Sequence, residues 1–130
     1  MAFTVRFSAD DARHGIAVGR GSPLLFRAVA LNTGNGFDSK TGIFTAPVAG
    51  TYVFFLMQLG VYARGSVTLD IVKHGGVLER VYCHGHEDQG SGQVTAPLRA
   101  GQQVWVRRVS GNAVRGRWYT VFTGYLIRAK

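Results

Sequence analysis

Apolar and polar residues alternate along most of the chain with a period of two, which is the period of a β-strand and not of a helix. Phe3, Val5 and Phe7 are separated by polar residues, so the first strand is predicted to have one apolar face. Glycine, asparagine and serine interrupt most of the alternating segments. The pattern predicts strands over residues 3–7, 26–31, 51–59, 66–73, 77–83, 93–98, 103–109, 115–119 and 121–127.

Residues 26–54 contain the clearest succession of strand, turn and strand. Residues 32–36, with the sequence NTGNG, include an Asn-Gly pair whose residues tolerate positive φ, so we expect a turn there. The strand before this turn is predicted to be buried on at least one face. Residues 51–59, TYVFFLMQL, form a nearly continuous apolar run, which predicts a strand buried on both faces.

Polar, glycine-containing segments connect the predicted strands. Residues 10–21 are expected to form a surface connection with a short strand at 16–18, and residues 84–92 a polar loop. A turn at residues 110–112 would make 103–109 and 115–119 the two arms of a hairpin. About eight to ten strands at intervals of roughly ten residues predict an antiparallel sandwich or barrel.

Composition agrees with one globular domain over residues 1–130. Hydrophobic residues make up 46% of the chain, and 18 glycines against 3 prolines suit short strands joined by turns. The chain shows neither an apolar run long enough to span a bilayer nor a visible signal peptide. The single cysteine, Cys83, is predicted to be a small hydrophobe on a strand, with an intersubunit bridge or a reactive thiol as the alternative.

The formal net charge of +8, carried mostly by arginine, favours anionic partners. Lipopolysaccharide, sulfated or sialylated glycans and nucleic acid all fit this charge, and a solubilising surface is the simpler alternative. Nucleic acid ranks last because the sequence contains none of the standard nucleic-acid-binding motifs.

Two groups of residues resemble a known family. One is spread over residues 26–54, and the other includes a Gly-x-x-Val-Trp segment and a Phe-x-Gly-aromatic-Leu segment near the C-terminus. The residues concerned are Phe26, Asn32, Phe37, Phe44, Gly50, Tyr52 and Phe54, then Gly101, Val104, Trp105, Phe122, Gly124, Tyr125 and Leu126. On these residues the chain resembles the globular head domain of the complement component 1q family, in the TNF-like superfamily, and within it the stalkless invertebrate proteins.

This resemblance implies an all-β, ten-strand jelly-roll sandwich of the TNF-like type that assembles as a homotrimer and is secreted. The 8 Phe, 5 Tyr and 2 Trp agree with a subunit interface, because they exceed what one thin sandwich needs. No collagen-like Gly-x-y repeat, which stalked relatives use to bundle their heads, is visible in the chain.

Arginines near the C-terminus are the main candidates for ligand binding. Arg107 and Arg108 precede the predicted turn at residues 110–112, and Arg115 and Arg117 follow it, so a hairpin would bring them together. The neighbouring Trp118 adds an aromatic face that suits an anionic sugar. Tyr62 belongs to a second candidate rim, and solvent-facing arginines without a ligand are the alternative.

The segment HGHEDQ at residues 84–89 concentrates potential metal ligands. If it is extended, His84 and His86 project to the same side and could share a zinc ion. The resemblance implies a different metal, because Asp88 and Gln89 are similar to an Asp-Gln pair that contributes oxygen ligands to calcium in some relatives. His84 stands where such sites often have a second acidic ligand, and an exposed polar loop without metal is the alternative.

The sequence does not favour an enzyme, because it contains no nucleophile elbow, His-Glu-x-x-His motif or phosphate-binding loop. The leading hypothesis is a secreted pattern-recognition protein of innate immunity, a lectin-like trimer that binds microbial glycans such as lipopolysaccharide or mannose-containing polymers. The alternative is a cytokine-like or adipokine-like trimer that binds a protein receptor. The identity of the glycan or receptor is not encoded in a motif of this chain.

Overall fold

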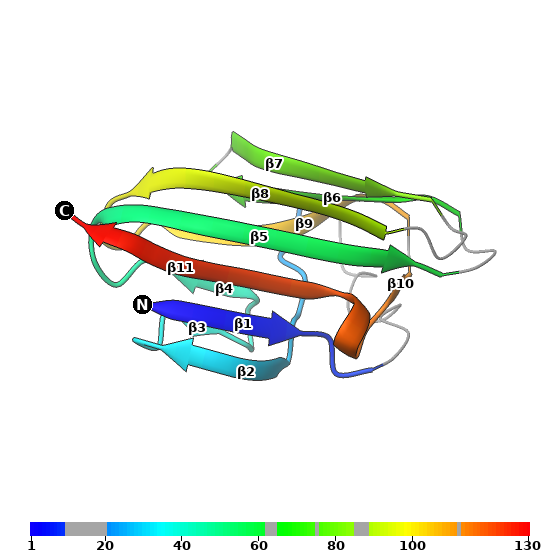
Figure 1. The fold of residues 1–130 in the computed structure, drawn as a ribbon, viewed down its shortest axis with the longest axis horizontal. Helices are drawn as coiled ribbons and strands as arrows, with labels where there is room; N and C mark the ends of the chain where they lie inside the picture. The colour runs from blue at the N-terminus through cyan, green and yellow to red at the C-terminus, as the bar shows by residue number, and fades with distance from the viewer. Residues whose placement is uncertain (10–20, 62–64, 75, 85–88, 112) are drawn as a thin grey trace.

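The computed structural model describes residues 1–9, 21–61, 65–74, 76–84, 89–111 and 113–130. They form two antiparallel sheets packed face to face, with both termini at the same end of the elongated sandwich (Figure 1). The elements are β1 (Ala2–Arg6), β2 (Ala28–Thr33), β3 (Phe37–Asp38), β4 (Ile43–Thr45), β5 (Gly50–Gly60), β6 (Val67–Lys73), β7 (Gly76–Cys83), β8 (Gln89–Leu98), β9 (Gln103–Ser110), β10 (Val114–Arg115), the 3₁₀ helix η1 (Arg117–Tyr119) and β11 (Val121–Ala129).

The long strand β5 is the centre of the six-stranded sheet. One edge of β5 pairs with β8, and the other edge pairs with β11 and, near its end, with β10. β1 pairs with the free edge of β11, and β2 pairs with β1 and completes the sheet. The five-stranded sheet has the order β3-β4-β9-β6-β7. This arrangement confirms the predicted jelly-roll sandwich. Among the described residues there are eleven strands, of which β3 and β10 have only two residues each.

Aromatic rings fill the space between the sheets. The ring of Phe3 lies 4.9 Å from that of Phe44 and 5.0 Å from that of Phe122, measured between centroids, and so joins the two layers. The rings fit because residue 124 is glycine. A Cβ at Gly124 would lie 2.4 Å from Cε2 of Phe3, far inside van der Waals contact. The Phe-x-Gly spacing on β11 is therefore a packing requirement of this core.

The turn predicted within residues 32–36 is confirmed. Positive φ falls on Gly34 and Asn35, at 87° and 55°, one residue earlier than the Asn35-Gly36 pair on which the prediction rested. The Asn32 side chain closes the turn by donating from Nδ2 to the Phe37 carbonyl oxygen at 2.8 Å and accepting from the Phe37 N–H at 3.1 Å. In contrast, the burial predicted for the strand before this turn is wrong for β2: none of its residues is buried, and Val29 and Leu31 of this edge strand are exposed.

Two other expectations are corrected. The strand at residues 51–59 is buried on its inward face at Tyr52, Phe54 and Leu56, but Phe55 on the other face is only half-buried. The loop predicted over 84–92 is too long, since β8 already begins at Gln89 and pairs with β5 from there on. The surface connection and short strand expected within residues 10–20 lie outside the described residues. Cys83 is fully buried at the end of β7, as predicted for a small hydrophobe.

Candidate functional site

The predicted hairpin around residues 110–112 does not form. β9 belongs to the five-stranded sheet, whereas β10 pairs with β5 in the six-stranded sheet, so the chain crosses the sandwich between them. Ala113 and Val114 are both fully buried, and their burial takes the chain through the core instead of back along β9. The candidate arginines are therefore divided between two places.

Arg107 is part of an arginine pair that is held by one carboxylate. Asp70 on β6 pairs in register with Arg80 on β7 and with Arg107 on β9. Arg80 donates from Nε and Nη2 to the two oxygens of Asp70 at 2.7 and 2.9 Å, and Arg107 donates from Nη2 at 3.1 Å. The Asp70 carboxylate is fully buried. The hydrogen bonds from Arg80, followed by those from Arg107, hold its pKa below the usual range although burial opposes them.

Arg80 was missed by the sequence reasoning, although the sequence contained a signal for it. An aspartate inside the apolar strand at residues 66–73 needs a partner on a neighbouring strand. Arg80, Arg107 and Arg108 line a shallow hollow of about 280 Å³ on the five-stranded sheet. Arg108 also donates from Nη1 to the Gly111 carbonyl oxygen at 3.3 Å. Because the single carboxylate of Asp70 is shared by two arginines, the net charge of this surface is positive.

We expect Asp70→Asn to lower the free energy of unfolding by about 2 kcal/mol at pH 7, since two guanidinium groups lose their common anion while Arg80 stays partly hydrated. The lowered pKa means that the stabilisation is complete above the ordinary carboxyl pKa and is lost as pH falls through the folded-state pKa. Urea unfolding at pH 7 and pH 3 measures this, with Asp38→Asn in an exposed turn as the control. A difference between wild type and Asp70→Asn that stays constant with pH would contradict the assignment.

The other candidate arginines surround an exposed tryptophan at the opposite sheet. Trp118, in η1, is 73% exposed. The Arg6 guanidinium lies 5.5 Å from the centre of its ring, and Arg117 donates from Nε to the Ser8 carbonyl oxygen at 2.9 Å. Arg115 lies over Tyr119 at 5.2 Å. Arg6, which comes from β1, is an addition that only the pairing of β1 with β11 could reveal.

Trp118 lines two adjacent hollows, which we call the tryptophan site. The first has a volume of about 230 Å³ and is lined by Arg6, Arg117 and the start of β2. The second has a volume of about 260 Å³ and is lined by Met57, Leu59, Gln89 and Tyr119. An indole ring with cations on one side and apolar groups on the other can stack on a sugar and pair with its anionic substituent.

The remaining candidates are not brought together in the described residues. Tyr62 and Asp88 lie outside them, as does His86. His84 is exposed, with Nδ1 3.4 Å from the Tyr82 hydroxyl, while Gln89 begins β8 and lines the tryptophan site. Within the described ranges no group of three or more His, Cys, Asp or Glu residues could hold a metal ion. The calcium and zinc predictions stay predictions.

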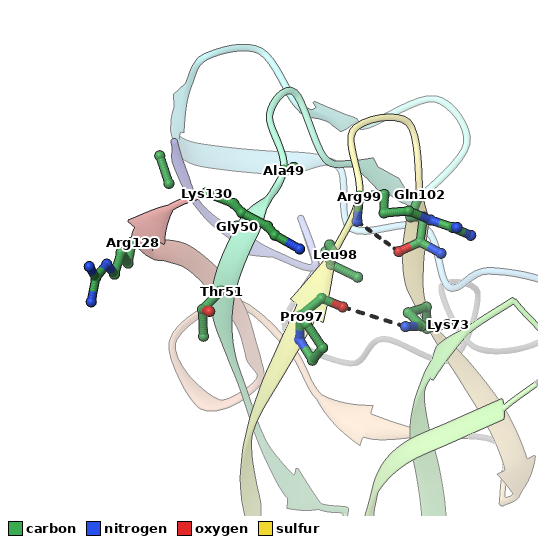
Figure 2. Close-up of a pocket in the computed structure, with 11 residues that line it drawn as sticks. Ala49, Gly50, Thr51, Lys73, Pro97, Leu98, Arg99, Gln102, Arg128 and Lys130 are labelled. Carbon is green, nitrogen blue, oxygen red and sulfur yellow. Dashed lines mark hydrogen bonds between the residues drawn. The ribbon is translucent and has the colours of Figure 1, made fainter.

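A third surface, which the sequence did not indicate, is a larger hollow at the end of the sandwich where the termini lie (Figure 2). This end hollow has a volume of about 620 Å³ and lies where β5 begins and where β6, β8 and β11 end. Its lining includes four cationic residues, Lys73, Arg99, Arg128 and Lys130. Lys73, Arg99 and the C-terminal pair Arg128 and Lys130 are far apart in the chain, and only the topology brings them together.

The outward face of the six-stranded sheet carries apolar residues of β2, β5 and β11 among threonines. Pairing places Leu31, Thr4, Thr123 and Phe55 in one row across four strands, and Tyr125 and Val53 in the next row. Tyr125 is 43% exposed, and the neighbouring Ile127 is 55% exposed. An exposed apolar face of this kind is typical of a protein interface.

Comparison with known proteins agrees with the fold. Residues 2–127 of the chain match the C1q domain family, and the chain therefore belongs to this family. The structure resembles the globular domain of zebrafish complement 1qA protein, with a TM-score of 0.77, 24% identity and coverage of 99% of this chain and 98% of that one. It also resembles Eiger TNF from S. frugiperda, with a TM-score of 0.74, 11% identity and coverage of 100% and 94%. These neighbours confirm the TNF-like fold.

Among curated proteins, human complement C1q tumor necrosis factor-related protein 3 is 30% identical over 128 residues, which are 95% of this chain and 51% of that protein. Human complement C1q and tumor necrosis factor-related protein 9A is 31% identical over 112 residues, 81% of this chain and 33% of that protein. The chain thus spans about half or less of their length. Membership of a family of binding domains confirms the non-enzymatic class. In the described part of the chain no helix is long and apolar enough to cross a membrane.

Proposed function

We propose that this chain is a single, secreted C1q domain that assembles as a homotrimer and binds microbial surface glycans, lipopolysaccharide first among them. The observation that carries the proposal is the tryptophan site, where an indole ring that is 73% exposed stands beside the guanidinium groups of Arg6 and Arg117. A ligand that covers the indole ring would remove apolar surface from water, which favours binding at this position.

The chemistry of the site fits an acidic sugar. The indole face packs against the C–H groups of a pyranose ring, and a guanidinium pairs with a phosphate or carboxylate through two parallel hydrogen bonds. Lipopolysaccharide carries such anionic groups on its sugars. Mannose-containing polymers would use the ring contact alone, and we therefore expect them to bind more weakly.

The trimer is supported by family membership and by the apolar outward face of the six-stranded sheet. Packing three such faces around a threefold axis would bury Tyr125 and Leu31. Three tryptophan sites would then be presented together, so weak single contacts would add up on a repetitive surface through effective concentration.

Asp88 and Gln89 are the residues that would hold a calcium ion. Gln89 lines the tryptophan site, so an ion held there would lie beside the bound sugar and add to its attraction for anions. A chelator should then weaken binding of lipopolysaccharide without abolishing it, since the arginines and the ring remain.

The double variant Arg117→Glu with Trp118→Ala tests the site. It removes the stacking face and reverses a charge, and we expect the Kd for immobilised lipopolysaccharide to rise more than tenfold. Biolayer interferometry with Lys40→Glu as the control gives the comparison, because Lys40 is an exposed cation in a distant turn. Equal binding by the double variant and the control would reject the tryptophan site.

The runner-up is a trimeric ligand for a protein receptor. It is favoured by the curated relatives, whose names join C1q with tumor necrosis factor, and by the likeness to Eiger TNF. A receptor ligand should bind no sugar at micromolar concentration, and its binding surface should include the groove between subunits and not Trp118.

A further inference from the structure

We propose that the end hollow is a second binding site, specific for a sugar unit that carries a phosphate or sulfate group. This inference is independent of the tryptophan site, because Trp118 lies in η1, just before β11 begins, whereas the end hollow lies where β11 ends (Figure 1). β11 runs from η1 to the end hollow, and its nine residues span about 30 Å at the rise of an extended strand. One monosaccharide cannot occupy both sites.

Three adjacent strands form the base of the end hollow. Gly50 and Thr51 of β5 pair with Leu98 and Pro97 on one side, and with Ala129 and Arg128 on the other. Lys73 at the end of β6 adds a cation from the five-stranded sheet. The hollow therefore lies where the two sheets end together, open to solvent and with an apolar wall of Pro97, Leu98 and Ala129.

Within the described part of the chain, no acidic side chain lines this hollow. The four cationic residues lining the hollow are Lys73, Arg99, Arg128 and Lys130. The described acidic residues are Asp38, Asp70 and Glu79, and none of them lines the hollow. Asp70 is already engaged by Arg80 and Arg107. Cations gathered without a counter-charge repel one another, and a bound anion relieves that repulsion.

The backbone around the hollow is fixed by hydrogen bonds. The Arg99 N–H donates to Oε1 of Gln102 at 2.8 Å, and the Gln102 N–H donates back to the Arg99 carbonyl oxygen at 3.1 Å. The Gly101 N–H donates to the Ala46 carbonyl oxygen, and the Lys130 N–H to that of Ala49, each at 2.9 Å. The cations are therefore carried by a preorganised frame, which lowers the entropic cost of binding.

The two lysines are the side chains best placed to contact a ligand. In Figure 2, Lys130 extends from the end of β11 over the hollow, while Arg128 extends outward from the rim. Lys73 lies on the opposite side, with Nζ 3.5 Å from the Pro97 carbonyl oxygen, at the long limit of a hydrogen bond. An ammonium group has three N–H donors, so Lys73 can contact an anion while it keeps this contact.

Size and charge together define the ligand class. A volume of about 620 Å³ is in the range of small-molecule sites and admits one or two sugar units. Pro97 and Leu98 offer an apolar surface to the sugar ring. A tetrahedral phosphate, with a charge between −1 and −2 at neutral pH, interacts with several cations at once more strongly than a single carboxylate does. Phosphate and sulfate share this chemistry.

The test uses isothermal titration calorimetry of the protein that carries Arg117→Glu and Trp118→Ala, so that the tryptophan site does not contribute. The titrants are glucose 6-phosphate, glucose 6-sulfate and neutral glucose. We expect the two anionic sugars to bind once per chain, more weakly as salt is raised, and glucose not to bind. The ratio of the two Kd values then shows whether the hollow prefers phosphate or sulfate.

Adding Lys73→Gln and Lys130→Gln should raise the Kd of the anionic sugars at least tenfold. The control adds Lys40→Gln and Arg27→Gln, which remove the same charge from exposed positions away from the hollow. If the lysine pair reduces stability, Lys130→Gln alone serves, because Lys130 follows the last strand. A Kd within twofold of the control, or binding of glucose as tight as that of glucose 6-phosphate, would overturn the site. Neither result bears on lipopolysaccharide binding at Trp118.

Discussion

Replacing Gly124 by valine should lower the free energy of unfolding by about 3 kcal/mol, because the new side chain would enter a filled core. A Cβ at this position would lie 2.4 Å from Cε2 and 2.7 Å from Cζ of Phe3, and 2.8 Å from Cδ1 of Phe54. These rings belong to the aromatic cluster that joins the sheets, so they cannot move aside without displacing Phe44 and Phe122. The whole sandwich would have to expand.

Urea unfolding followed by tryptophan fluorescence measures this loss. The control is Gly76→Ala on β7, where the nearest atom to the added Cβ is the Lys73 carbonyl oxygen at 3.6 Å, an ordinary contact. We expect this control to stay within about 0.5 kcal/mol of the wild type. If Gly124→Val were as harmless as Gly76→Ala, the packing explanation of the Phe-x-Gly spacing would be wrong.

Replacing Tyr125 by glutamate should dissociate the proposed trimer. Tyr125 lies on the outward apolar face of the six-stranded sheet, where a threefold interface would bring three new carboxylates into a desolvated region. Sedimentation velocity should change from about three times the chain mass of 14.1 kDa to a single chain. Retention on a lipopolysaccharide-coated surface should fall by a factor of about 100, because avidity is lost while each site is intact.

Tyr82→Glu is the matched control for this change. Tyr82 is 50% exposed, and it lies on β7 in the other sheet. The same substitution there should leave the protein trimeric. Dissociation by both variants, or by neither, would remove the support for an interface on the six-stranded sheet.

The alternating pattern was sufficient to predict most strands, because a strand with one buried face shows its period directly in the sequence. β1, β5, β6, β7, β9 and β11 all appear close to the predicted ranges. The first four residues of β8, Gln89–Gly92, were missed because none of them is apolar, and their pairing with β5 makes them part of the strand. Such pairing is a long-range property that a local pattern does not contain.

The hairpin failed for a related reason. A turn signal near Gly111 predicts a change of direction, but it does not say whether the chain stays in one sheet or crosses to the other. Because Ala113 and Val114 are buried, the chain crosses from one sheet to the other at this point. The crossing separates Arg107 from Arg115. A strand was also expected over residues 115–119, where the structure has the short β10 followed by η1.

The candidate sites were only partly predictable. Trp118 and Arg117 could be selected from the sequence because they are neighbours, and the structure adds Arg6 from the other end of the chain. The Arg80–Asp70–Arg107 cluster depends on strand register, and the end hollow depends on where four strands end. Chemistry assembled by topology is visible only once the sheets are built.

The most direct test of the central claim is a glycan array probed with the wild-type protein, with and without a calcium chelator. We predict binding at micromolar protein to lipopolysaccharide and other anionic microbial glycans, in preference to neutral glycans of the same backbone. A uniformly dark array, together with tight binding of a receptor ectodomain, would contradict glycan recognition and leave the receptor-ligand function in its place.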